Sequence, residues 1–524
     1  MNRNLPVFRL LLALLILLPA SAISRQLQDD FLRAAAAQEA GRYSDAENHL
    51  KTAIEQAERA GDERSLSRSL DALAGLYEAQ GKYQEALPLF LRSIGLREQA
   101  AGSGSFAVAG QLVCVGILYR KLAMFPESEQ ALERALSIYQ KSDPPNRMEM
   151  LSPAESLAIL YRNMGKFAES EQLYSQILFI KQSARSESSL SIGSTLGNLA
   201  VLLRHQGRYE EADKAYERAL AIEVPALGAD SPLLAMTYNN RAVLYLMQDR
   251  FAEAEVLAQK ALAIMEKSLP AGHPDIGRAL DTLGGAYMNE GNYDLALSCY
   301  QKALGIRKEK LGPAHPDLAE TMGNLGSLYE RQKKYAEAEG MYRQSIAMME
   351  KVLAPKHRQI ASETQRLAAI LRIQGKYGEA EPLFLRALSM RESLLGSEHP
   401  EVSQTLNSMG VLYSQWGKLA EAEKCYVRAL AIREKSLGME HPAVATTLRN
   451  LGILYQKERK NREAEECFRR SLAIREKVLG PDHADLAVIL TTYANFLRGV
   501  NRAGEAAKLE SRARAIEAAI RSRK

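Results

Sequence analysis

Residues 406–438 read LNSMGVLYSQWGKLAEAEKCYVRALAIREKSLG, and apolar or small residues recur three and four positions apart on both sides of Gly417. The first side offers Leu406, Met409, Gly410 and Tyr413, and the second offers Ala422, Tyr426, Ala429 and Leu430. This spacing places such residues on one face of an α-helix. Gly417 suits a positive φ between two helices, and Glu421 suits the first turn of the second, where the helix dipole favours an anion. The stretch therefore predicts two helices joined by a tight turn.

The same two-helix unit recurs along the whole chain. Its turn, G-[KR]-[YF]-x-E-A, appears as GKYQEA, GRYEEA and GKYGEA, and its aromatic position returns every 42 residues after a first step of 40. That position holds Tyr43, Tyr83, Phe125, Phe167, Tyr209, Phe251, Tyr293, Tyr335 and Tyr377, and the register continues through Leu419, Asn461 and Ala503. Twelve units of this length nearly fill the chain. We therefore predict one repeat array over residues 27–524, in which the charged last unit is a polar cap.

Six of the eight histidines follow the same interval of 42 residues, which raises the question of a metal site. They are His273, His315, His357, His399, His441 and His483. Three of them begin the sequence H-P-[DE], in which proline suits the first position of a helix and the acid suits its first turn. We therefore expect each histidine to begin the first helix of a unit. Copies on neighbouring units would lie at least ~8–10 Å apart, whereas zinc ligands lie within ~2.1 Å of the metal, so no metal site is expected.

No motif in the chain points to catalysis. The sequence contains no glycine-rich phosphate loop, no G-x-S-x-G, no H-E-x-x-H and no Cys–His metal spacing. A glutamate recurs at the start of the second helices, but general acid and base catalysis needs two carboxylates in different environments at one pocket. We therefore predict that the chain is not an enzyme and has no catalytic residue and no cofactor.

Residues 1–22 have the form of a bacterial export signal. Arg3 and Arg9 lie before nine consecutive apolar residues, which begin directly after Arg9. Ala20-Ser21-Ala22 is a small-residue cleavage site. We expect cleavage after Ala22 and a periplasmic or secreted protein. The apolar run is shorter than the ~20 residues that span a bilayer, although retention of the segment as an anchor is the alternative. Its removal lowers the formal net charge from +5 to +3, a balance that argues against a nucleic-acid partner.

The repeated motifs together resemble the tetratricopeptide repeat (TPR), in the 42-residue form of the kinesin light chain family. They are L-x-x-[LM]-[GA]-x-L-Y, G-K-Y-x-E-A-E, [RK]-A-L-x-I-R-E-K-x-L-G and H-P-[DE], and they cover almost all of residues 27–524. The resemblance implies an all-α fold, an α-solenoid of about twelve helix-turn-helix repeats in a right-handed superhelix. It also implies a concave groove lined by the first helix of each pair. It does not imply a motor function, because no amino-terminal heptad segment is present.

One column of the first helices holds Asn198, Asn240, Asn324 and Asn450. An amide both donates and accepts hydrogen bonds, so it can pair with the backbone of an extended peptide of any sequence. Similarly placed asparagines contact cargo peptides in the kinesin light chain family, and the resemblance implies this role for these four. Other members of this asparagine column are Thr282, Arg366, Ser408 and Thr492, so ordinary solvated positions are the alternative. The neighbouring Arg278, Arg366 and Arg449 are candidates for binding a carboxylate of the ligand.

These patterns predict an exported, non-enzymatic scaffold that binds a protein or an extended peptide in its groove. We expect no nucleic acid among its partners and no membrane span after signal cleavage. Two alternatives to this scaffold function remain. The first is a regulatory subunit of a separate catalytic partner, and the second is a structural protein that assembles with itself as a homo-oligomer.

Overall fold

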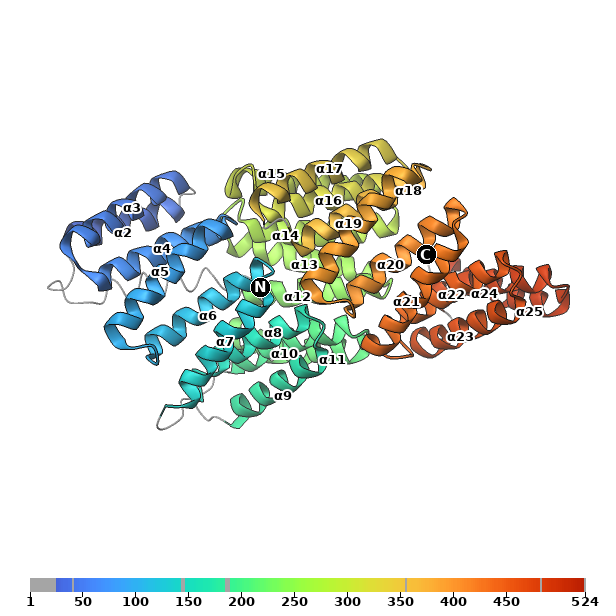
Figure 1. Ribbon diagram of the computed structural model, residues 1–524, viewed down its shortest axis with the longest axis horizontal. Coiled ribbons are helices and arrows are strands. Elements are labelled where there is room, and N and C mark those ends of the chain that lie inside the picture. The colour runs from blue at the N-terminus through green and yellow to red at the C-terminus, as the bar shows by residue number, and fades with distance from the viewer. Residues whose placement is uncertain are drawn as a thin grey trace. The chain divides into compact units, whose positions relative to one another are not determined.

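The computed structural model describes residues 25–39, 42–142, 147–183, 189–353, 356–480 and 483–522. The predicted signal, residues 1–22, and its expected cleavage after Ala22 lie outside this part. The described residues form α-helices and no strand, and successive helices pair along the chain (Figure 1). The chain divides into two compact units, Met1–Leu202 with Tyr209–Ile360 and Leu203–Arg208 with Ala361–Lys524. Each unit is considered by itself below.

The first unit holds eight helix pairs in its described part. They are α2 (Arg25–Glu39) with α3 (Tyr43–Ala60), α4 (Glu63–Ala79) with α5 (Tyr83–Ala101), α6 (Phe106–Lys121) with α7 (Phe125–Gln140), α8 (Leu151–Asn163) with α9 (Phe167–Ser183), α10 (Ser189–His205) with α11 (Tyr209–Leu227), α12 (Pro232–Met247) with α13 (Phe251–Ser268), α14 (Pro274–Glu290) with α15 (Tyr293–Leu311), and α16 (Pro316–Arg331) with α17 (Tyr335–Val352). The predicted aromatic turn position begins the second helix of every one of these pairs.

Four more pairs belong mainly to the second unit. They are α18 (Arg358–Ile373) with α19 (Tyr377–Leu395), α20 (Pro400–Trp416) with α21 (Leu419–Leu437), α22 (Pro442–Lys457) with α23 (Asn461–Leu479), and α24 (Ala484–Gly499) with α25 (Ala503–Ser522). The described residues therefore contain twelve helix pairs, and the prediction of an all-α repeat fold of about twelve units is confirmed.

The turn inside each pair has the backbone conformation that the sequence predicts. Gly417 ends α20 with φ +86°, and its N–H donates to the carbonyl of Tyr413. Some units lack glycine at this turn and still adopt φ of +58° to +61°, at Ala123, Asp249, Lys333, Arg459 and Asn501. A non-glycine residue in this conformation costs about 1–2 kcal/mol. The packing of the two helices therefore imposes this turn, and glycine only lowers the conformational free energy that the turn requires.

Within a pair, a small residue of the first helix lies against an aromatic ring of the second. A Cβ atom added to Gly410 would lie 2.5 Å from Cε1 of Tyr426, and one added to Gly326 would lie 2.7 Å from Cε1 of Tyr342. Both rings are buried. The tyrosines at this position thus form part of the core of the pairs that contain them, where large rings bury much apolar area.

The histidines cap the first helices, as the sequence predicts. At His273, His315, His357, His399 and His441, the ring Nδ1 accepts a hydrogen bond of 3.0 to 3.2 Å from the backbone N–H two residues later. An accepting Nδ1 means that the imidazole is neutral and carries its proton on Nε2. The 42-residue histidine ladder is therefore a set of helix N-caps.

In the first unit the histidines also have a second partner, which the sequence does not indicate. Nε2 of His357 donates to the backbone carbonyl of Lys121 at 2.9 Å, across 236 residues of sequence. His315 and Pro316 lie against the turn glycine Gly81, where an added Cβ would be 2.9 Å from Cδ2 of His315 and 2.8 Å from Cδ of Pro316. The helix pairs of this unit therefore curve enough to bring an early turn onto a late helix N-terminus.

Alanine at Gly81 is expected to destabilise the protein more than alanine at Gly375, its equivalent seven repeats later. The two glycines have φ of +73° and +76°, but an added Cβ meets nothing within 4 Å at Gly375. Both variants carry the same backbone strain, whereas only Gly81→Ala displaces His315 and Pro316, which costs about 1–3 kcal/mol more. Urea unfolding followed by circular dichroism at 222 nm measures the difference. Equal losses for the two variants would mean that the close approach at Gly81 adds nothing to stability.

Candidate functional site

The four asparagines proposed to bind a peptide do not share one environment. Asn198 on α10 is only 3% exposed, while Asn240 on α12, Asn324 on α16 and Asn450 on α22 are half-buried. The amide of Asn324 lies beside the Asp281 carboxylate and acts to lower its pKa, and Nδ2 of Asn450 donates to Oδ1 of Asn407 at 3.2 Å. These two asparagines therefore face the first helix of the preceding pair.

Asn240 differs because its partner position is empty. The residue 43 positions earlier, which is Asp281 for Asn324 and Asn407 for Asn450, is Gly197 for Asn240. Within the part of the chain that the structure describes, the amide of Asn240 makes no hydrogen bond. Its donor and its acceptor are both available to a ligand, whereas Asn198 is largely covered.

The three arginines suggested as carboxylate ligands differ in exposure and partners. Arg278 pairs with Asp275 at 3.2 Å, and Arg366 pairs with Glu363 at 3.3 Å, in each case on the same helix. Arg366 is exposed, and Arg449 is half-buried. Because Arg278 and Arg366 have counter-charges beside them, their charge is partly compensated before any ligand arrives.

A buried polar contact that sequence reasoning missed joins three consecutive helices. Arg307 of α15 is 2% exposed, and its NH1 donates to Oδ2 of Asp281 on α14 at 2.5 Å and to the hydroxyl of Thr321 on α16. It also donates to the carbonyl of Asp317 at 2.8 Å. We call such a set a polar node: a second-helix residue, the residue 26 positions earlier and the residue 14 positions later. A node ties one helix pair to the next.

Polar nodes recur with the same spacings. The NH2 of Arg97 pairs with Asp71, Nζ of Lys181 lies 2.7 Å from Glu155 and 2.9 Å from Thr195, NH1 of Arg391 donates to Gln365 and Thr405, and NH1 of Arg433 donates to Thr447. Where the second-helix residue is Met265 or Met349, the residue 26 positions earlier is the uncharged Asn239 or Gly323. In these nodes, a buried second-helix cation thus has a carboxylate or another polar group as its partner. Where the second-helix residue is neutral, the residue 26 positions earlier is neutral too.

Burial dominates the electrostatics of the acidic node residues. It raises the pKa of Asp281 to about 6, although the charge of Arg307 acts in the opposite direction. The pKa of Asp71 is raised to about 6 for the same reason, against the pull of Arg97. The cost of removing these carboxylates from water therefore exceeds the attraction of their partners.

The node of α11 reverses the charges of these nodes, and α23 also departs from them, since the residue 26 positions before Arg475 is Arg449. Glu223 stands in the position of the cation, and Gly197 stands in the position of the acid. The hydroxyl of Thr237 donates to Oε2 of Glu223 at 2.7 Å. Glu223 is 5% exposed, burial raises its pKa, and no basic side chain of the described residues pairs with it. The node therefore holds a buried carboxylate that lacks a counter-cation.

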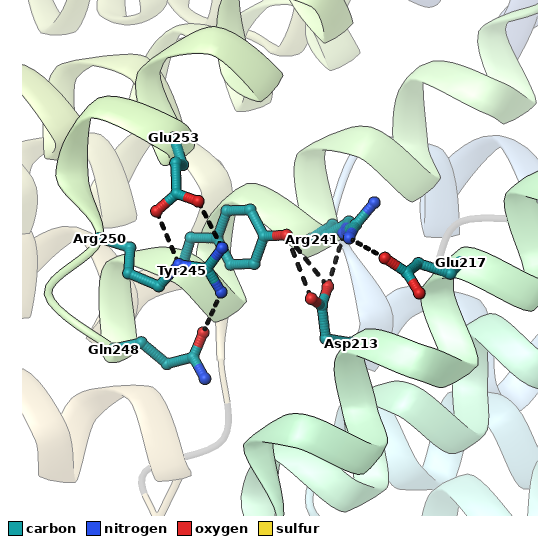
Figure 2. A network of polar contacts seen from close by, with 7 residues as sticks. All are labelled: Asp213, Glu217, Arg241, Tyr245, Gln248, Arg250 and Glu253. Carbon is teal, nitrogen blue, oxygen red and sulfur yellow. Dashed lines mark hydrogen bonds and ion pairs between the residues drawn. The ribbon is translucent and has the colours of Figure 1, made fainter. Parts of the chain in front are cut away.

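A second polar network lies at the junction of α11 and α12, and its arginines pair with acids other than Glu223. Figure 2 shows Arg241 directed at Asp213 and Glu217, with Nε of Arg241 2.6 Å from Oδ1 of Asp213 and its NH2 2.9 Å from Oε1 of Glu217. The hydroxyl of Tyr245 donates to Asp213, and the guanidinium of Arg250 lies over the Tyr245 ring and pairs with Glu253. The charge of Arg241 is thus taken up by Asp213 and Glu217, and not by Glu223.

The described residues contain neither a metal-binding cluster nor a membrane-spanning helix. No group of three or more His, Cys, Asp or Glu side chains there is placed to hold a metal ion. No helix in the described ranges combines the length and the apolar character that crossing a membrane requires.

Comparison with known proteins identifies relatives of most of the repeat array. A family model described as tetratricopeptide repeat matches residues 30–99, 191–267, 275–351, 360–435, 417–476 and 443–517. Similar solved structures include a Rap protein complexed with Competence and Sporulation Factor, at 14% identity over 71% of this chain and 98% of that chain, with a TM-score of 0.49. BtubC (BKLC) from P. vanneervenii is 23% identical over 43% of this chain and 91% of its own, with a TM-score of 0.38.

A putative kinesin light chain from Podospora anserina with nearly identical TPR-like repeats is also similar. It shares 24% identity over 39% of this chain and 97% of its own, with a TM-score of 0.34. None of the curated proteins matches this chain.

Proposed function

We propose, from the premise that the chain belongs to the tetratricopeptide repeat family, that it is a scaffold that binds an extended peptide or protein segment along its first helices. The observation that carries this proposal is Asn240, a half-buried amide in a repeated column whose donor and acceptor have no partner among the described residues. A peptide backbone offers the matching acceptor and donor.

The spacing of the asparagine column suits an extended ligand. Neighbouring packed helices lie about 8–10 Å apart, and three residues of a polyproline II segment span about 9 Å. A polyproline II ligand along the column therefore advances about three residues per repeat, and the amide of Asn240 can bond its backbone at one of them. Such bonding is independent of the ligand's side chains, so selectivity has to come from residues beside the column.

The residues of the amino terminus support a place outside the cytosol. We propose that residues 1–22 direct export and that the chain acts in the periplasm or after secretion, with the partner also there. Scaffold repeats of this kind act through what they bind, so the proposal assigns no reaction to the chain itself. Fractionation of cells that express the protein, with a blot of each fraction, tests the location.

Alanine at Asn240 is expected to weaken peptide binding about tenfold, because it removes a donor and an acceptor that the ligand backbone uses. The probe is a fluorescent peptide selected from a phage-displayed random 12-residue library against the purified protein, and its Kd is measured by fluorescence anisotropy. Asn289→Ala is the matched control, since Asn289 already bonds within the chain, to Gly285 and Arg331. This control is expected to leave Kd unchanged within about twofold.

Two outcomes would contradict the proposal. If Asn240→Ala and Asn289→Ala bind the selected peptide as tightly as the unaltered protein, the binding surface is not the asparagine column. If no peptide is selected and light scattering shows growing assemblies across a concentration series, the chain is better described as a self-assembling structural protein.

A further inference from the structure

Two polar nodes 84 residues apart are built on the same frame and differ at two positions. The shared residues are Gly193 and Gly277, Thr237 and Thr321, and Asn240 and Asn324. The differences are Gly197 in place of Asp281 and Glu223 in place of Arg307. In one node the described residues supply both charges of an ion pair, and in the other they supply a negative charge alone.

The node of Arg307 is internally complete. Its guanidinium bonds Asp281 and Thr321, and the amide of Asn324 lies beside the Asp281 carboxylate and acts to lower its pKa. The side chain at position 281 thus lies between the buried cation and the asparagine column. A group in the equivalent place at Gly197 would lie between residue 223 and Asn240 in the same way.

The node of Glu223 is incomplete at that same place. Gly197 has no side chain, and an added Cβ would meet nothing within 4 Å, so the space that Asp281 occupies in the other node is open. Asn240 has no hydrogen-bond partner in the described part of the chain. Among the described residues, only the hydroxyl of Thr237 bonds Glu223. The open space at Gly197, the unbonded amide of Asn240 and the uncompensated carboxylate of Glu223 therefore stand at the positions that Asp281, Asn324 and Arg307 hold in the other node.

A buried carboxylate is costly unless a cation and hydrogen bonds accompany it. The chain avoids this cost at Met265, where the residue 26 positions earlier, Asn239, and the residue 14 positions later, Ala279, are both neutral. Arg241 does not supply the missing charge, because it is bonded to Asp213 and Glu217 (Figure 2). Among the described residues, the node of Glu223 thus lacks a positive charge.

We propose that this node receives a lysine or arginine side chain of the bound peptide. The side chain enters the open space at Gly197 and places its ammonium or guanidinium group on the Glu223 carboxylate, while the neighbouring peptide unit bonds the amide of Asn240. The ligand then supplies the cation that Arg307 supplies within the chain. This inference rests on the proposed peptide binding and deepens it, because it assigns a basic residue to one position of the ligand.

The test compares a selected peptide that contains lysine with its norleucine analogue, which keeps the side-chain length and removes the charge. On the unaltered protein, norleucine is expected to raise Kd at least about tenfold, since a charge-assisted hydrogen bond in a covered site is lost. On Glu223→Met the two peptides are expected to bind alike, and the lysine peptide is expected to lose about tenfold. Methionine is the matched substitution, because the chain uses it at Met265 and Met349.

A second variant guards against a general loss of folding. Gly197→Asp combined with Glu223→Arg copies the Arg307 node onto a frame that already has Gly193, Thr237 and Asn240. This variant is expected to unfold at no lower urea concentration than the unaltered protein and to show no preference for lysine over norleucine.

Each result separates the inference from the proposed function. If selected peptides show no preference for a basic residue, or if the preference persists undiminished on Glu223→Met, the inference is overturned while binding that depends on Asn240 keeps the proposed function. If no peptide binds the unaltered protein at all, the proposed function fails and the inference fails with it.

Discussion

Replacement of Arg307 by methionine is expected to lower the free energy of unfolding by about 3–5 kcal/mol, the usual cost of removing one partner of a buried ion pair. The variant leaves the Asp281 carboxylate covered and without its cation, and it also leaves the hydroxyl of Thr321 and the carbonyl of Asp317 without this donor. Urea unfolding monitored by circular dichroism at 222 nm gives the change. Because helix pairs of a repeat array contact mainly their neighbours, hydrogen exchange of α14 and α16 should rise most.

The chain provides its own control for this prediction. Arg307→Met combined with Asp281→Asn reproduces the Met265 and Asn239 pair of the preceding unit. Burial already raises the pKa of Asp281 to about 6 in spite of Arg307, so the carboxylate contributes little net stability at neutral pH. We therefore expect the double variant to recover most of the loss, with a coupling energy of about 2 kcal/mol or more. A double variant as unstable as Arg307→Met alone would show that the arginine acts through packing and not through charge.

The fold could be predicted from the sequence because its signals are local. Three signals carry the prediction: the turn at Gly417, the apolar spacing around it and the histidine before each proline. Each determines backbone conformation or helix packing within a few residues of its own position. The contact of His357 with Lys121 could not be found this way, since it depends on how far the six helix pairs from α6 to α17 curve, and no short motif encodes that curvature.

The candidate site was only partly accessible from the sequence for a related reason. The asparagine column is visible as a period, but whether a given amide is free depends on the residue 43 positions earlier, which is Asp281 for Asn324 and Gly197 for Asn240. The polar nodes connect positions 14 and 26 residues apart on three helices. A comparison of the repeats shows that position 223 is a glutamate where several other units have an arginine. The effect of this change becomes clear only when it is known which repeat positions contact one another in the fold.

Acidification is the condition expected to have the largest effect on the intact protein, because the fold holds several histidines neutral. Burial, with Arg433 nearby, lowers the pKa of His441 to about 4 from 6.5, and burial also lowers the pKa of His273, His315 and His357. A protonated ring would turn its Nδ1 into a donor facing the backbone N–H that it now caps. The unfolded state thus binds more protons than the folded state between pH 6.5 and 4.

The sign of the effect follows from these values. The stability held by the neutral His441 is fully present above pH 6.5 and is lost as the pH falls toward 4, and the loss reaches about 2 kcal/mol at pH 5. His441→Asn isolates it, since asparagine caps a helix well and does not titrate. Urea unfolding of both proteins from pH 7.5 to 5, followed by the fluorescence of the single tryptophan Trp416 in the same unit, measures the difference. The variant should lose less stability than the unaltered protein over this range. A difference between the two proteins that stays constant with pH would mean that the folded structure does not hold His441 neutral, and that its cap is as strong when the ring is charged.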